Sequence, residues 1–191
     1  MKKPFNDQPV EELVKKYLQG SGGCKLDLSM KYIGDDGLKF IAGAEELRGL
    51  KELILERNEI TAKGIMALAE SKIITHLTLL DVERNDIGDK GAKIIAGSAN
   101  FSNLQTLNLW KNNIGASGAK ELSQSINLMN LTHLDLAQNK IGDEGAKALA
   151  DSLILSNLNY LDVYGNGITA EGINLLKSSE IISKIPNLVM E

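Results

Sequence analysis

The side chains that could carry acid–base or metal chemistry are few in this sequence and lie far apart along it. The chain contains two histidines, His76 and His133, and one cysteine, Cys24. No spacing typical of metal ligands and no G-x-S-x-G motif connects them. We therefore predict no catalytic residue, no metal site and no cofactor.

Two regularly spaced aspartates raise the question of paired-carboxylate catalysis. Asp81, Asn108 and Asp135 follow one another at intervals of 27 residues. On successive strands of one sheet, the two carboxyl groups would lie about 10 Å apart with the asparagine between them. The sequence gives no reason for a raised pKa at either carboxyl group, so we expect ordinary acidic side chains.

Other residue types are better suited to recognising a protein. Trp110 is the only tryptophan, and Tyr160 and Tyr164 follow it along the chain. Large rigid rings that carry a polar atom are common anchors of protein interfaces. The competing interpretation is that the rings only shield a sheet from water and that the aspartates nearby are filler.

The predicted binding surface combines these rings with charged neighbours. The acidic zone comprises Asp27, Glu52, Glu56, Asp81 and Glu83, and the aromatic zone that follows comprises Trp110, His133, Tyr160 and Tyr164. We expect the acidic zone to select a basic patch on the partner. His133 is expected to contact Tyr160 or Trp110 rather than to act as a base, and Arg84 to pair with Glu83. The predicted partner-binding residues are Trp110, Tyr164, Tyr160, His133, Asp135, Asp162, Glu83, Asp81, Glu56 and Arg84.

An internal repeat determines how these side chains are positioned. The segment LLDVERNDIGDKGAKIIA, residues 79–96, first alternates apolar and polar residues and then places apolar residues at helical spacing. The pattern L-x-x-L-x-L-x-x-N-x-I recurs every 27 residues, as leucine-rich repeats do. We number each repeat from its first leucine, so that Leu77 is position 1. Positions 4 and 6 face the core, and positions 3, 5 and 7 face away from it.

The asparagine at position 9 has a predicted structural role. Buried turns leave backbone groups that need partners, and an inward amide offers two donors and an acceptor. We predict a ladder that ties the loops of neighbouring repeats together. Its members are Asn58, Asn85, Asn112, Asn139 and Asn166.

The helical half of each repeat carries its own signals. Thr61 and Thr169, and the pairs Gly88-Asp89 and Gly142-Asp143, are predicted N-cap residues. Glycine recurs at one position, where we expect close approach to the neighbouring repeat. Acid–lysine pairs such as Asp89 and Lys93 are predicted to stabilise the helices at i, i+4 spacing. A lysine row is expected on the solvated convex face, with a docking stripe as the alternative; it comprises Lys39, Lys93, Lys120 and Lys147.

The repeats divide the chain into a cap and a solenoid. Residues 1–22 are predicted to contain an amphipathic capping helix over 6–19, with Asp7 as its N-cap. Residues 23–191 are predicted to form six 27-residue repeats and a truncated seventh strand, with Ile185, Leu188 and Met190 facing the core. This last strand either ends the core as a minimal cap or pairs with a second copy of the chain.

The repeat pattern resembles the ribonuclease-inhibitor subfamily of leucine-rich repeats. This resemblance implies an α/β right-handed horseshoe, with about seven parallel strands on the concave face and helices on the convex face. The Ran GTPase-activating protein is similar in repeat type, which implies a rival function with Arg57 or Arg84 as an arginine finger. The small, cysteine-poor chain also resembles leucine-rich-repeat effectors that bacteria deliver into the host cytosol, although no delivery signal is evident.

Composition restricts the function further. The 191 residues carry a net charge of −4 and a pI near 5.3, which argues against nucleic acid as the main partner. No apolar run is long enough for a membrane span, and one cysteine permits no internal disulfide, so we expect a cytoplasmic protein. The sequence predicts a non-enzymatic scaffold that binds another folded protein in its concave face, with masking of an enzyme as a specific form.

Overall fold

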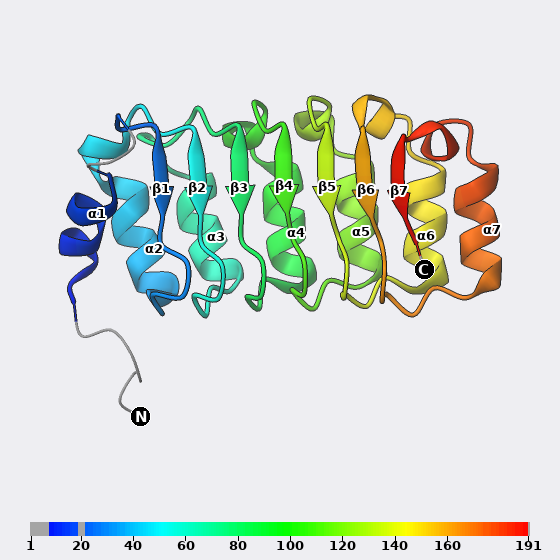
Figure 1. The fold of residues 1–191 in the computed structure, drawn as a ribbon, viewed down its shortest axis with the longest axis horizontal. Coiled ribbons are helices and arrows are strands. Elements are labelled where there is room, and N and C mark those ends of the chain that lie inside the picture. Colours follow the sequence, from blue (N-terminus) through cyan, green and yellow to red (C-terminus); the bar gives the residue numbers. More distant parts are fainter. Residues whose placement is uncertain (1–7, 19–21, 191) are drawn as a thin grey trace.

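The computed structural model describes residues 8–18 and 22–190. Within this range the chain forms one open sheet of seven parallel strands, each paired with the next in sequence order. The helices lie together behind the sheet and leave its other face open (Figure 1). The strands are β1 (Lys25–Asp27), β2 (Glu52–Ile54), β3 (Leu79–Asp81), β4 (Thr106–Asn108), β5 (His133–Asp135), β6 (Tyr160–Asp162) and β7 (Asn187–Val189). This is the predicted solenoid.

The helices follow the same 27-residue spacing as the strands. They are α1 (Val10–Leu18), α2 (Gly34–Gly43), α3 (Ala62–Ala69), α4 (Gly88–Gly97), α5 (Ala116–Ser123), α6 (Gly142–Ala150) and α7 (Ala170–Ser178). Short 3-10 helices precede most of the strands. They are η1 (Glu45–Leu47), η2 (Ala99–Phe101), η3 (Ile126–Leu128), η4 (Leu155–Asn157) and η5 (Ile182–Lys184). Within residues 22–190, the connection from α3 to β3 lacks such a turn.

Apolar residues at equivalent repeat positions build the core between sheet and helices. Leu53, Leu80 and Leu107 lie side by side on neighbouring strands, as the repeat register predicts. All three are fully buried. Burying one such side chain contributes about 1.5 to 3 kcal/mol, and the stack repeats this contribution along its length.

The asparagine at position 9 fastens each loop to the one before it. The Asn85 Oδ1 accepts from the backbone N–H groups of Asn58 (2.9 Å) and Ile60 (3.0 Å). Its Nδ2 donates to the carbonyls of Leu55 (2.9 Å) and Val82 (2.8 Å). Bonds of the same kind are made by Asn58, Asn112, Asn139 and Asn166. The amide therefore satisfies the polar groups that stacking buries.

A second ladder, built from serine, lies at the opposite end of the helices. Each of these serines follows the helix of its own repeat, and its hydroxyl group donates to a carbonyl near the end of the helix in the preceding repeat, at 2.5 to 2.9 Å. Its members are Ser71, Ser98, Ser125, Ser152 and Ser179. Their 27-residue spacing is visible in the sequence, but the repeat motif ends before them and the serine ladder was not predicted.

Successive repeats are joined in two alternating ways, although their length is constant. Asp89 accepts from the N–H groups of Gly115 (2.6 Å) and Gly118 (3.0 Å), at the start of the next helix. Asp35 and Asp143 reach forward in the same way, to Thr61 and Thr169, the N-cap residues of α3 and α7.

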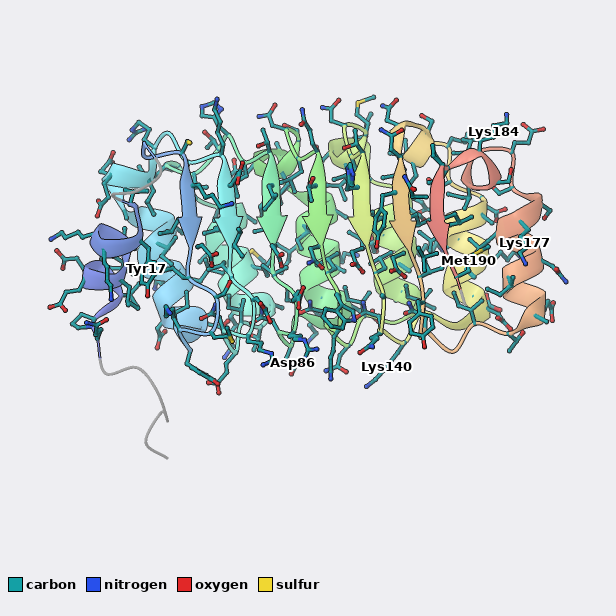
Figure 2. The ribbon with its side chains drawn as sticks, viewed as in Figure 1. Tyr17, Asp86, Lys140, Lys177, Lys184 and Met190 are labelled. Carbon is teal, nitrogen blue, oxygen red and sulfur yellow. The ribbon has the colours of Figure 1, made fainter. Side chains whose placement is uncertain are left out.

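The remaining junctions between repeats use backbone bridges instead. Asp86 N–H donates to the Ile60 carbonyl at 2.9 Å, and Lys140 N–H donates to the Ile114 carbonyl at 2.7 Å. Asp86 and Lys140 lie on the loops beyond the carboxyl ends of the strands (Figure 2). The sequence repeat of one unit thus becomes a structural repeat of two.

This alternation corrects part of the N-cap prediction. Thr61 and Thr169 cap their own helices by accepting from the N–H two residues on. Asp89 and Asp143 do not cap their own helices, whose N-cap residues Ile87 and Ile141 make no side-chain capping bond. The expected Asp89–Lys93 pair is also wrong, because Asp89 is bonded to the next repeat and the Lys93 Nζ lies 3.0 Å from Glu121 Oε1.

The glycine repeated in the first helical turn makes room for these junctions. A Cβ added at Gly118 would lie 2.7 Å from the Asp89 Oδ1, and one added at Gly64 would lie 2.7 Å from the Asp35 Oδ1. Real Cβ atoms essentially never approach an atom this closely. The close approach predicted at this position is therefore confirmed.

The two ends of the core are covered differently. In α1, Leu13 and Val14 are buried in the core cluster, while the predicted N-cap Asp7 and the expected helix ends 6 and 19 lie outside the described residues. At the other end, β7 pairs with β6 at the predicted register. Leu188 and Met190 are only partly buried there.

Candidate binding surface

The open face of the sheet presents parallel rows of side chains from positions 3, 5 and 7 of the repeat. The inner row is position 5: Asp27, Ile54, Asp81, Asn108, Asp135 and Asp162. The outer row is position 7: Ser29, Glu56, Glu83, Trp110, Ala137 and Tyr164. Backbone pairing continues beyond the strands, as Lys111 N–H donates to the Ala137 carbonyl at 2.9 Å and Gln138 N–H to the Tyr164 carbonyl at 2.7 Å. Outer-row residues of neighbouring repeats therefore lie side by side.

The polar inner-row residues also have a structural role. Asp135 accepts from the N–H of Ala137 at 2.9 Å, and Asp162 from that of Tyr164 at 2.8 Å. Asp27, Asp81 and Asn108 make the same bond two residues on. This local bond holds the outer-row backbone in place. The inner-row aspartates therefore have a structural role in addition to any role in binding.

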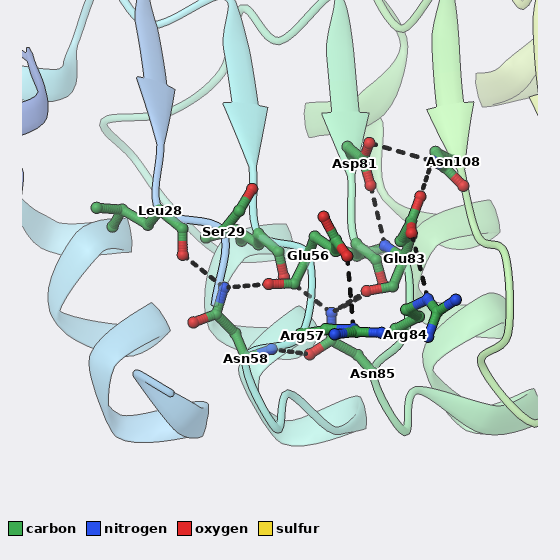
Figure 3. A network of polar contacts seen from close by, with 12 residues as sticks. Leu28, Ser29, Glu56, Arg57, Asn58, Asp81, Glu83, Arg84, Asn85 and Asn108 are labelled. Atoms are coloured by element: carbon green, nitrogen blue, oxygen red, sulfur yellow. Dashed lines mark hydrogen bonds and ion pairs between the residues drawn. The ribbon is translucent and has the colours of Figure 1, made fainter. Parts of the chain in front are cut away.

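In the acidic zone, carboxylates are gathered around one amide. The Asn108 Nδ2 donates to Asp81 Oδ2 and to Glu83 Oε2, both at 3.1 Å (Figure 3). Burial raises the pKa of Asp81, and the charges of Glu56 and Asp27 add to this effect. Burial likewise raises the pKa of Glu83. The prediction that Asp81 has an ordinary pKa is therefore wrong. Neighbouring side chains shield its carboxylate from water, and the other carboxylates nearby oppose its charge.

Asp135 has the largest pKa shift among the inner-row residues. Burial, followed by the charges of Asp162 and Asp81, raises its pKa to about 6. The prediction for Asp81 and Asp135 fails for the same reason in both cases. The hydrogen bond that Asp135 accepts from the Ala137 N–H acts in the opposite direction on its pKa and gives the carboxylate a structural partner.

Trp110 and Arg84 form one unit. The Arg84 Cζ lies 4.4 Å from the centre of the indole ring, within the range of cation–π contacts. The Arg84 Nε also lies 3.5 Å from Glu83 Oε1, as predicted. Trp110 is half-buried as a result, not freely exposed. This contact supports one orientation of the ring on the open face.

The remaining aromatic residues lie on β5 and β6 and just beyond. The rings of His133 and Tyr160 stack with centres 6.0 Å apart, which is one of the two contacts expected for His133. The Tyr160 hydroxyl donates to Asp162 Oδ2 at 3.2 Å. Burial and the charges of Asp162 and Asp135 raise the pKa of Tyr160 to about 12, so it remains a neutral donor. Tyr164 is 49% exposed, and His133 is also exposed, whereas Trp110 and Tyr160 are half-buried.

Comparison with known families agrees with this geometry. The family model described as "Leucine Rich repeat" matches residues 48–69, 74–96, 102–123, 127–150 and 155–176, more than half of the chain. The chain belongs to the leucine-rich repeat family. Proteins built from leucine-rich repeats are generally binding scaffolds. No curated protein matches the sequence.

Three solved leucine-rich repeat structures are similar to this chain to different degrees, and the internalin shares its fold. An internalin, inlF, from Listeria monocytogenes is 24% identical with a TM-score of 0.55, and the match covers 78% of this chain and 36% of the internalin. The SOBIR1 receptor kinase ectodomain from Arabidopsis thaliana is 22% identical with a TM-score of 0.36, over 67% of this chain and 61% of that one. The Arabidopsis thaliana GASSHO1/SCHENGEN3 ectodomain, solved with CASPARIAN STRIP INTEGRITY FACTOR 2, is 25% identical with a TM-score of 0.40, over 76% and 16%.

The chain therefore spans little more than a third of the internalin structure. The internalin likeness supports the repeat architecture and not a shared partner.

Arg57 and Arg84, at position 8, adopt a backbone conformation that recurs in every complete repeat. Position 8 adopts left-handed φ values of 51° to 69° in every complete repeat, at Met30, Arg57, Arg84, Lys111, Gln138 and Gly165. The conformation of Arg57 and Arg84 is thus a repeat-wide requirement and does not single out an arginine finger. The Arg57 Nε lies 3.5 Å from Glu56 Oε1 and faces an acid on the same loop.

Among residues 8–18 and 22–190, no group of three or more His, Cys, Asp and Glu side chains is arranged to hold a metal ion. Over the same residues, no helix has the length and apolar character needed to cross a bilayer.

Proposed function

We propose that this leucine-rich repeat protein is a non-enzymatic scaffold that binds one folded protein across its open sheet face. The observation that carries the proposal is the row of Trp110, Ala137 and Tyr164 at position 7, with His133 and Tyr160 at position 3 of the same face. Fixed rings beside a half-exposed one offer contact area at a low cost in conformational entropy.

The acidic zone defines the chemistry of the partner. Glu56, Asp81 and Glu83 lie next to the aromatic zone on the same face, and burial already opposes the charge of the last two. A basic patch on the partner would supply the countercharge that these carboxylates lack within the chain. Within the chain, Arg84 supplies part of it to Glu83 and Arg57 supplies part of it to Glu56.

The test is a capture experiment with a folded variant. The native chain and a Trp110→Ala, Tyr164→Ala variant are immobilised, and proteins retained from lysates are identified by mass spectrometry. We expect one protein to be retained by the native chain and reduced at least tenfold by the variant, since interface anchors each contribute about 2 kcal/mol or more.

The matched control removes a helix-face side chain of similar exposure. Phe40→Ala changes an exposed aromatic residue on α2, and circular dichroism confirms that each variant is folded. Equal retention of the same proteins by the native chain and the double variant would contradict the proposal. An activity assay of the captured protein, with and without the chain, then tests whether binding blocks an enzyme.

Narrower forms of the proposal rest on resemblance. Blocking an enzyme's active site follows from the likeness to the ribonuclease-inhibitor subfamily. Action in the cytoplasm, including that of a bacterial protein delivered to the host cytosol, follows from the single cysteine and the likeness to bacterial effectors. Localisation of the tagged protein in its native cell distinguishes these settings.

Self-association is a second candidate, favoured by one observation. Among the described residues, β7 pairs with β6 on one side and has no strand on the other, and its residues are partly exposed. An open strand edge can pair with a second copy. Light scattering would show twice the monomer mass, and Leu188→Pro would restore the monomer; a monomer at all concentrations excludes this candidate.

A further inference from the structure

The helical side of the molecule contains an apolar groove of about 680 Å³ between α3 and α4. Its volume is within the range of roughly 300 to 1,000 Å³ that ligand sites occupy. The floor and walls are formed mainly by Met66, Ala69, Ile94 and Ala99, and Met66 is 41% exposed. The groove lies on the face opposite to the proposed scaffold surface.

Two departures from the repeat create this groove. Met66 occupies the register position at which α2, α4, α5 and α6 carry lysine. The connection that follows α3 is also the one that lacks a 3-10 turn within residues 22–190. At the corresponding place between α5 and α6, the surface is lined by charged residues such as Lys120, Glu144 and Lys147. The apolar character is therefore local and not a property of the repeat.

Backbone hydrogen bonding within the groove is already satisfied. The Ala69 carbonyl accepts from Ser98 Oγ at 2.9 Å and from Asn100 Nδ2 at 3.0 Å. An extended peptide laid here would find no exposed strand edge and would leave its own backbone groups facing apolar side chains. A helix satisfies its own backbone and presents only side chains to the groove.

The charges on the walls specify the sign of the occupant. Lys90 and Lys93 line the groove, against a single acid, Glu70. Lys93 pairs with Glu121 at 3.0 Å, but this pair is solvent-exposed and contributes little.

We propose that the α3–α4 groove binds an acidic amphipathic helix of a partner protein. Leucine or methionine residues at i, i+3 and i+7 of that helix enter the groove beside Met66 and Ile94. Aspartate or glutamate residues flanking them meet Lys90 and Lys93. This site is separate from the open sheet face, and its failure would leave the proposed function unaffected.

The experiment uses displayed helices as probes. A library of 18-residue amphipathic helices with an apolar stripe and Asp or Glu elsewhere is selected against the native chain, in parallel with a library carrying Lys or Arg instead. Binders are then measured against a Met66→Lys, Ile94→Glu variant. Both substitutions copy residues found at the same register in neighbouring repeats, Lys93 and Glu121, so the variant is expected to fold.

The expected result is selection from the acidic library alone, with binding reduced at least tenfold by the variant. An Ala148→Glu variant, at the register of Ile94 but between α5 and α6, should bind like the native chain. Recovery of no binders, recovery from the basic library, or equal binding to the variant would overturn the proposal. So would binding of the native chain, but not of the Met66→Lys, Ile94→Glu variant, to vesicles of phosphatidylcholine with phosphatidylserine, which would identify a lipid surface instead.

Discussion

Asn85 illustrates how much of the fold depends on single amides. Its side chain is 9% exposed and bonds to the backbone of two repeats. Asn85→Leu would keep the apolar volume but would leave these donors and acceptors without partners. We expect a loss of about 1 to 3 kcal/mol in the free energy of unfolding, measured by urea denaturation. Asn159→Leu, at an exposed position, should change the midpoint little; an equal effect of both variants would contradict this account.

Asp135 should weaken the fold at neutral pH. Because its folded pKa is raised to about 6 from 3.8, the folded state binds more protons than the unfolded state between these values, and stability falls as pH rises through them. Asp135→Asn keeps an acceptor for the Ala137 N–H, as Asn108 does for Trp110. We expect the variant to be more stable at pH 7.5 by roughly 1 kcal/mol, after allowance for partial exposure.

The gain at Asp135 should disappear near pH 4, and thermal denaturation at the two pH values measures it.

Asp143 provides the opposite case. Hydrogen bonds from Thr169 hold the pKa of Asp143 low, so its stabilisation is present at neutral pH and is lost as pH falls. Asp143→Asn should therefore lower the melting temperature at pH 7.5 more than at pH 3. If both variants changed the melting temperature at pH 7.5 in the same direction, the opposite pKa shifts of Asp135 and Asp143 would be refuted.

At the scale of elements, the forward-reaching aspartates join one helix to the next. Asp89→Ala would remove the acceptor for two N–H groups of α5 and should cost about 1 to 2 kcal/mol, as the loss of an N-cap does. Urea denaturation gives the loss, and hydrogen exchange at the start of α5 locates it. Asp36→Ala, an exposed acid in the first turn of α2, is the control. Equal losses of stability in both variants would show that the negative charge in the first turn, and not the hydrogen bonds between Asp89 and the next repeat, is responsible.

The sequence predicted these elements unevenly. The strands, their register and the inward direction of Asn85 follow from the 27-residue period, because every repeat imposes the same alternation on the same core. The partner of Asp89 could not be read from that period, since its acceptor role depends on where the next helix starts in space. The pKa of Asp135 was missed for a similar reason, because desolvation arises from side chains that come together only when three strands are aligned.

For the whole molecule, the distribution of charge matters more than the net charge of −4. The acidic zone lies on one face, so association with a basic partner should be steered by it and slow as ionic strength rises. Stopped-flow association with the captured partner measures this. A Glu56→Gln, Glu83→Gln variant should show a weaker salt dependence, and a Glu144→Gln, Glu171→Gln variant on the helices should not. Rates that are independent of salt in the native chain would exclude steering.

The alternating junctions have a consequence for how such a chain can change length. An inserted or deleted single repeat would bring two junctions of the same type together, which would leave either an aspartate without a helix start to bond or a helix start without its acceptor. Gain or loss of two repeats would preserve every bond. Growth of this protein by duplication, and its redesign to a different size, should therefore proceed in steps of two.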